Sequence, residues 1–105
     1  MQVDADCFVD SSVEIKVLGI EQHLEFLIEE PNHANFDKLL KLLENIETLV
    51  FSSSRGRCPT QMKLLYQLDT RVRDMINYNK FDKTSADKLR MDCYPVLWSI
   101  IPTRK

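Results

Sequence analysis

Apolar residues recur at steps of three and four along most of this chain, a spacing that gathers side chains on one face of a helix. The first such segment has a start signal, because Ser11 is followed three positions later by Glu14, as in a capping box. Pro31 ends it, since the residue before a proline avoids the helical region. The apolar positions on its face are Val17, Ile20, Leu24, Leu27 and Ile28.

The second helical segment opens at Asn35, a residue that favours the N-cap position. Its broad apolar stripe consists of Phe36, Leu39, Leu40, Leu43, Ile46 and Val50. The sequence "SSSRGRCP" then interrupts the pattern, and we expect a mobile loop there, because serine, glycine and proline favour turns. Residues 52–57 could form a phosphorylation site or a basic contact, although a solvated linker is the commoner meaning of such a cluster.

Two further helical segments follow this predicted loop. One begins at Thr60 and the other at a second capping box, in which Thr84 precedes Asp87 by three positions. Pro95 lies inside the last segment, where it removes a helical hydrogen bond, so we expect a kink or a break into two short helices. The apolar positions of the two segments are Leu64, Leu65, Leu68, Val72, Met75 and Ile76, and then Leu89, Cys93, Leu97 and Ile100.

The chain contains only two glycines and four prolines, which leaves little material for strands and tight hairpins. The sequence therefore predicts an all-α fold, a compact bundle of four to five short helices. We place one domain at residues 11–102, between an N-terminal tail at 1–10 and a C-terminal tail at 103–105. The predicted core contains Leu24, Leu27, Leu40, Leu43, Leu65, Leu68, Val72, Ile76 and Leu97.

Composition narrows the class of protein. A chain of 105 residues with 44% apolar and 29% charged residues is typical of one globular domain. The formal net charge of −2, with both signs mixed along the chain, argues against nucleic-acid binding. No apolar run is long enough to suggest a membrane span, and the acidic N-terminus does not resemble a secretory signal. We therefore expect an intracellular protein that does not bind membranes.

Candidate chemistry is sparse. The three cysteines, Cys7, Cys58 and Cys93, form no CxxC motif, so we expect packing residues in a reducing compartment. His23 and His33 are the only histidines and lack partners at zinc-like spacing, so we expect no metal. The chain has no nucleophile elbow, glycine-rich phosphate loop or HExxH motif, and we therefore expect neither an enzyme nor a cofactor.

Three stretches of the sequence resemble one known family. The run "IEQHLEFLIEEPNHANFDKLLKLLENIETLV" resembles the opening of the N-terminal domain shared by transcription elongation factor TFIIS, Elongin A and a Mediator subunit. "TRVRDMIN" at 70–77 is similar to the family's "TRIGxxVN", and Trp98 stands near the family's tryptophan. The related integrase-binding domain of lens epithelium-derived growth factor has an aromatic residue where Tyr78 stands here. The sequence departs from the family at the "SSSRGRCPTQMK" insertion, at Arg73 and at Pro95.

This resemblance implies a function. Domains of the family are bundles of about five short helices that bind short, disordered peptides, acidic with aromatic or aliphatic anchors, in nuclear transcription elongation and chromatin proteins. It thus implies a monomeric, non-enzymatic interaction domain whose partner-binding residues lie on two loops. They are Pro31 and Asn32 on the first loop, and Tyr78, Lys80 and Phe81 on the second. A purely structural alternative for Phe81 is a hydrophobic staple that packs on the helix following it.

Two other classes of protein remain open. A BAG-like chaperone adaptor would dock through a charged helix flank that carries Lys63, Arg71 and Arg73. A structural domain within a larger assembly is the third possibility. Shape distinguishes the first two classes, because a BAG bundle has three long, nearly parallel helices, whereas the elongation-factor type has several short helices at steeper angles.

Overall fold

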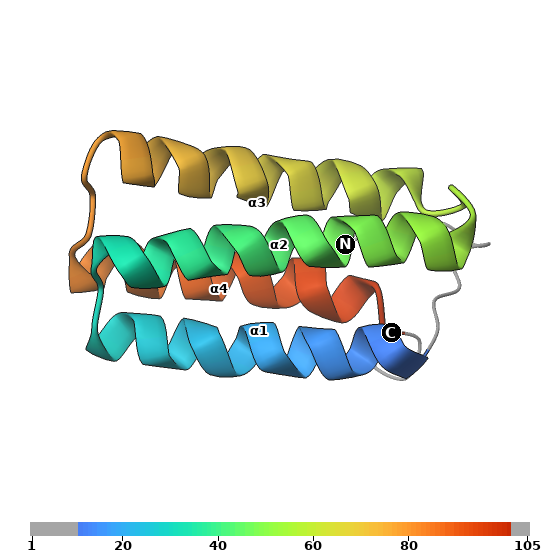
Figure 1. Cartoon of the computed structure of the whole chain (residues 1–105), viewed down its shortest axis with the longest axis horizontal. Coiled ribbons are helices and arrows are strands. Elements are labelled where there is room, and N and C mark those ends of the chain that lie inside the picture. Colours follow the sequence, from blue (N-terminus) through green and yellow to red (C-terminus); the bar gives the residue numbers. More distant parts are fainter. Residues whose placement is uncertain (1–10, 102–105) are drawn as a thin grey trace.

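The computed structural model describes residues 11–101, and every regular element in this part of the chain is an α-helix (Figure 1). The predicted all-α fold is therefore confirmed. The helices contain 17 to 22 residues each, which exceeds the mean of about 11–12 residues for globular proteins. They are α1 (Ser11–Glu29), α2 (His33–Ser54), α3 (Pro59–Asn77) and α4 (Lys83–Ser99).

The four helices run side by side along the long axis of the molecule (Figure 1). α1 packs on α2 and α4, and α3 packs on the same two helices, so the bundle closes on itself in an up-down-up-down order. α3 contacts α2 extensively and α4 only lightly. The helix number lies within the predicted range, whereas the long, side-by-side helices are closer to the shape expected of a chaperone adaptor than to five short, steeply crossed ones.

The core fills the centre of this bundle. Seven of the nine predicted core residues are buried, while Leu40 and Ile76 are only partly buried because they lie at the edges of the apolar stripes of their helices. Phe36 is completely buried. The other large side chains that are fully buried are Ile20, Leu24, Leu27, Leu39, Leu43, Ile46, Leu65, Leu89, Leu97, Ile100 and Ile101.

The helix caps differ from the predicted ones. Asn32, and not Asn35, caps α2: its side-chain oxygen accepts a hydrogen bond from the Asn35 amide at 2.9 Å. Asp82, and not Thr84, caps α4 by accepting from the Ser85 amide at 2.9 Å. Asn and Asp are stronger N-caps than Thr, which explains why α4 begins two residues earlier than its capping-box pattern suggests. Ser11 is already helical, so the cap of α1 lies outside the described residues.

The predicted loop after residue 51 is shorter than expected. α2 continues to Ser54, because Ser54 lies four positions after Val50 on the same buried face. Arg55 and Gly56 then adopt positive φ angles of 55° and 76° and end the helix. Only residues 55–58 connect α2 to α3, and α3 begins at Pro59, a favourable first helical residue. A solvated linker over residues 52–57 is therefore wrong for its first half.

Pro95 does not divide the last helix. α4 is helical on both sides of this proline, and the side chain lies on the exposed face. The predicted break into two short helices is therefore wrong.

The cysteines differ from one another. Cys93 is a buried free thiol, and burial raises its pKa to about 12, as expected of a packing residue. Cys58 is disulfide-bonded, which the prediction of three packing cysteines missed. Its bonding partner falls outside residues 11–101. Because disulfides persist mainly in oxidising compartments, this bond gives no support to a reducing location.

Candidate functional site

The two loops that carry the predicted binding residues lie at the same end of the bundle (Figure 1). Phe81 joins them, because its ring centroid lies 5.2 Å from that of Phe36 and 5.7 Å from that of His33, both in the first turns of α2. The staple hypothesis expected Phe81 to pack on the helix that follows it. The aromatic rings that Phe81 contacts belong to α2, and the staple on α4 stays a prediction.

Three of the five predicted residues therefore have roles in the fold. Phe81 is partly buried against the core, and Asn32 is the cap of α2. Pro31 is half-buried in the short connection between α1 and α2. Tyr78 and Lys80, in contrast, are exposed side chains that remain available to a partner.

The end of α3 holds Tyr78 out from the bundle. The Lys80 amide donates to the Met75 carbonyl at 2.8 Å and the Asn79 amide donates to the Ile76 carbonyl at 3.2 Å, which is the Schellman arrangement. Asn79 takes the left-handed conformation that this motif requires, with φ 54°. Tyr78 is 73% exposed, more than any other large apolar side chain in residues 11–101. Its position is thus fixed by the backbone while its ring stays in solvent.

Tyr78 and Lys80 border a shallow cavity on the outer side of α3. This cavity has a volume of about 420 Å³, and a second of about 480 Å³ adjoins it. The two share Gln67 and Thr70, so they form one continuous depression, which we call the α3 groove. The described residues that line it are Pro59, Met62, Lys63, Tyr66, Gln67, Thr70, Arg71, Asp74, Met75, Tyr78 and Lys80.

The groove combines an apolar floor with a basic border. Met62 and Met75 are almost fully buried in its floor, and methionine adapts its shape to different partners. Lys63, Arg71 and Lys80 outnumber Asp74, so the lining carries two excess positive charges in a chain whose net charge is −2. The groove is therefore complementary to an acidic ligand with an apolar side chain.

The groove unites residues from two of the sequence hypotheses. Lys63 and Arg71 came from the adaptor hypothesis, and Tyr78 and Lys80 came from the family resemblance. Arg71 also forms an ion pair with Asp92 of α4.

Arg73, the third arginine or lysine of the adaptor hypothesis, does not line the groove. Its guanidinium contacts Asp69 of the same helix and Glu44 of α2 at 2.5 Å each. Met62 and Tyr66 line the groove but were not singled out from the sequence. The sequence could have pointed to Tyr66, because it is an aromatic residue on the polar side of an amphipathic helix.

No protein-family model, curated protein or solved structure matches this chain. The resemblance to the elongation-factor domain, with its nuclear and transcriptional setting, therefore stays a prediction. The function has to be argued from the groove and its surroundings.

Other chemistry in residues 11–101 is limited. His23 is buried, and its Nε2 donates to the Asn35 carbonyl oxygen at 2.8 Å, so this ring links α1 to α2. Within the described residues, no group of three or more His, Cys, Asp or Glu side chains could hold a metal ion. None of the four helices combines the length and apolarity needed to cross a bilayer.

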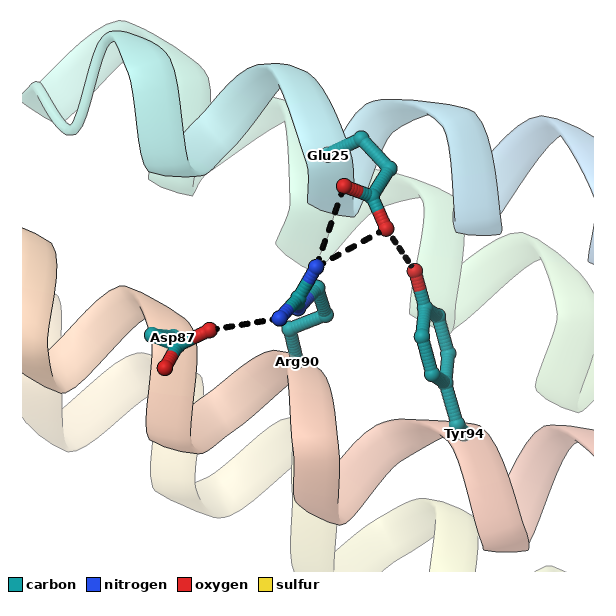
Figure 2. A network of polar contacts seen from close by, with 4 residues as sticks. All are labelled: Glu25, Asp87, Arg90 and Tyr94. Carbon is teal, nitrogen blue, oxygen red and sulfur yellow. Dashed lines mark hydrogen bonds and ion pairs between the residues drawn. The ribbon is translucent and has the colours of Figure 1, made fainter.

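A polar network joins α1 to α4 (Figure 2). Arg90 donates to both carboxylate oxygens of Glu25 at 3.1 Å and to Asp87 at 2.7 Å. The Tyr94 hydroxyl donates to Glu25 as well. This hydrogen bond, followed by the guanidinium of Arg90, holds the pKa of Glu25 below its usual value. We interpret the network as structural, because the Glu25 carboxylate already accepts hydrogen bonds from Arg90 and Tyr94 and is stabilised as an anion.

Proposed function

We propose that this domain is a non-enzymatic interaction module that binds an acidic segment of a partner protein along the α3 groove. The observation that supports it is the union of a methionine floor, two exposed tyrosines and a basic border on one helix face. An aromatic or aliphatic side chain of the partner would enter the part of the groove that Met75 and Tyr78 line. Its acidic residues would meet Lys63 and Lys80, which form no ion pair within residues 11–101.

The dimensions of the groove favour a peptide over a small metabolite. Pro59 and Tyr78 are nineteen residues apart on a helix, which corresponds to about 28 Å. An extended segment of roughly eight or nine residues spans this distance. The groove is shallow over this length, whereas small-molecule sites usually enclose most of their ligand. Binding energy would therefore concentrate at the anchor, with weaker contacts along the border.

The resemblance adds a setting to this proposal, because it predicts that such partners belong to transcription elongation or chromatin proteins. Two observations favour the adaptor alternative: the long, side-by-side helices, and the presence of Lys63 and Arg71 in the same groove. A folded partner would contact the charged flank broadly and depend little on Tyr78. The two proposals thus differ in the residue that carries the binding energy.

Selection from a peptide library tests the proposal. We would display random peptides of about ten residues that are rich in Asp and Glu with one Phe or Leu, beside a matched library rich in Lys. We expect the acidic library alone to be enriched. The selected peptides should shift NMR signals of α3 residues that line the groove.

Tyr78→Ala should weaken binding of a selected peptide by on the order of 2 kcal/mol, or about thirtyfold, because it removes a wall of the anchor site. Lys80→Glu should slow association and reduce its salt dependence, since border charges act mainly on encounter. Phe26→Ala is the matched control, because Phe26 is a half-exposed aromatic residue on α1. Equal enrichment of the basic library, or a Phe26 effect as large as that of Tyr78, would contradict the proposal.

A further inference from the structure

A smaller cavity lies on the other side of Tyr66, between α2 and α3. It has a volume of about 230 Å³ and is lined by Glu47, Thr48, Phe51, Ser52 and Tyr66. Phe51 and Tyr66 are 59% and 53% exposed, whereas Glu47 is only 8% exposed. The volume is below the range of roughly 300–1,000 Å³ typical of drug-sized ligands, so the cavity suits a single side chain or a small ion. We call it the Glu47 pocket.

The charges around this pocket do not balance. Glu44 and Glu47 of α2 and Asp69 of α3 supply three carboxyl groups, and Arg73 supplies the one guanidinium. Arg73 donates Nε to Asp69 and Nη2 to Glu44, each at 2.5 Å. Glu47 Oε1 is buried and has no hydrogen-bond partner. With all three carboxyl groups ionised, the cluster would lack two positive charges, and Oε1 of Glu47 has no donor.

The protonation of Glu47 reflects this deficit. Burial, and then the neighbouring Asp69 carboxylate, raise the pKa of Glu47 from 4.5 to about 8. A side-chain hydrogen bond to Asp69 and then Glu44 raise it further, and Arg73 lowers it. At neutral pH the Glu47 carboxyl group therefore holds a proton, which it donates to Asp69. An ion that supplied the positive charge would displace that proton.

The chemistry of the pocket selects an organic cation. The carboxyl groups do not converge on a site for a metal ion within the described residues. Phe51 and Tyr66 instead line the pocket with aromatic rings, and aromatic rings attract ammonium groups. A buried carboxyl group in a pocket with two aromatic rings is suited to an ammonium group on an aliphatic stem, as at the end of a lysine side chain.

We propose that the Glu47 pocket binds a primary ammonium group, such as a lysine side chain of a partner protein. The ammonium group lies beside the Glu47 carboxyl group, and its positive charge lies close to the side chains of Phe51 and Tyr66, which line the same pocket. The protonated Glu47 carboxyl and the ammonium ion give a carboxylate–ammonium pair and one released proton. The site lies across Tyr66 from the α3 groove, and it does not depend on what the groove binds.

The simplest probe is n-butylammonium, with n-butanol as its neutral counterpart. Titrated into the full-length protein, n-butylammonium should shift the amide signals of Thr48, Phe51 and Tyr66 with a dissociation constant on the order of millimolar. n-Butanol should produce no saturable shift there. Equal responses to both compounds would show simple filling of an apolar hollow and would overturn the proposal, as would no response to either.

The pH profile connects binding to Glu47. The affinity for n-butylammonium should rise about tenfold per pH unit between pH 6 and pH 7 and level off above pH 8, because only ionised Glu47 forms the pair. In Glu47→Gln the profile should be flat, and binding at pH 8 at least about tenfold weaker. A steep profile that persists in Glu47→Gln would assign the proton to another group and overturn the proposal.

Two further variants are controls, the first for a change in folding and the second for general electrostatics. Phe51→Leu replaces a largely exposed ring, so it should leave the fold intact and weaken binding several-fold without changing the pH slope. Asp37→Asn removes an exposed carboxylate elsewhere on α2, where Asp37 pairs with Lys41 at 3.2 Å. It should change neither affinity nor slope. An effect of Asp37→Asn equal to that of Glu47→Gln would reduce the result to general electrostatics and overturn the proposal.

Discussion

The interface between α1 and α4 and the interface between α2 and α3, which we call the α1–α4 seam and the α2–α3 seam, contain the same residue types. The pKa of a glutamate is nevertheless lowered in the first seam and raised in the second. Each places an arginine among carboxyl groups from two helices. In the α1–α4 seam the exposed Glu25 accepts from Tyr94 and Arg90, and its pKa is lowered. In the α2–α3 seam the donors of Arg73 go to other carboxylates, so burial governs Glu47 and its pKa is raised. What decides the charge of a carboxyl group is whether a donor reaches it.

The spacing of residues explains this difference. On α4, Arg90, Tyr94 and Trp98 follow one another at steps of four, and their donors meet Glu21 and Glu25 of α1 at the same step. The rings of Tyr94 and Trp98 stack with centroids 5.4 Å apart. The α2–α3 seam has no such ladder of donors. Glu47 is therefore the carboxyl group of this seam beside which binding of a cation from outside should be most favourable.

The largest expected effect concerns the core, where the two seams should not differ. Leu43→Ala in α2 and Leu97→Ala in α4 each remove a fully buried side chain, so each should lower the free energy of unfolding by about 2–5 kcal/mol. Denaturant titration measures both. Leu18→Ala, at a position on α1 that is 41% exposed, is the control and should cost clearly less than either core substitution. A fall in the free energy of unfolding for only one of these two variants would mean that the seams differ in core packing as well as at their polar edges.

The next largest expected effect is a pH dependence of the free energy of unfolding that should differ between the two seams. Because folded Glu47 keeps its proton to about pH 8 while the unfolded chain releases it near pH 4.5, its contribution to stability is complete below pH 4.5 and disappears as pH rises through 8. The loss should not exceed about 1.4 kcal/mol per pH unit within this window. Glu47→Gln cannot ionise. Its free energy of unfolding should therefore exceed that of the wild type by an amount that grows from pH 6 to about pH 8 and then levels off.

Thermal unfolding of the two proteins at several pH values measures this difference. Glu25→Gln, in the other seam, is the matched control, and its difference from the wild type should stay constant over the same range, because Glu25 is ionised throughout. Parallel curves for Glu47→Gln and the wild type would mean that Glu47 is ionised in the folded state. The contrast between the seams would then be lost.

Most of the fold followed from the sequence because helical periodicity reports burial directly. The positions at threes and fours gave four helices and seven correct core residues, among them Leu24 and Leu65. The caps were harder, since Asn32 and Asn35 are both good candidates and only tertiary packing selects one. Ser54 was assigned to a loop by its residue type, although its position four residues after Val50 places it on the buried face.

The candidate site was only partly predictable. Tyr78 and Lys80 stood out as polar-flanked residues after a helix, and the structure leaves both exposed. Phe81 looked equally available, but it packs on Phe36, a contact that no local pattern reveals. The Glu47 pocket was invisible in the sequence, because Glu47 faces outward in a simple helical pattern and its burial arises from α3. Seams between helices are thus where sequence reasoning is weakest.

The smallest effect tests the donors of the α1–α4 seam. Tyr94→Phe removes the hydroxyl that donates to Glu25 and should lower the free energy of unfolding at pH 7 by less than about 1 kcal/mol, as expected of an exposed polar contact. The pKa of folded Glu25 is lowered, so the bond stabilises the fold above pH 4.5 and is lost as pH falls through that lower pKa. The difference between Tyr94→Phe and the wild type should therefore shrink towards pH 3. Tyr66→Phe, whose side chain lies against the other seam, should show no such pH dependence. A Tyr94→Phe deficit that is the same at pH 3 and pH 7 would mean that the hydroxyl stabilises the seam independently of the charge of Glu25, because the phenyl ring that stacks on Trp98 is retained in this variant.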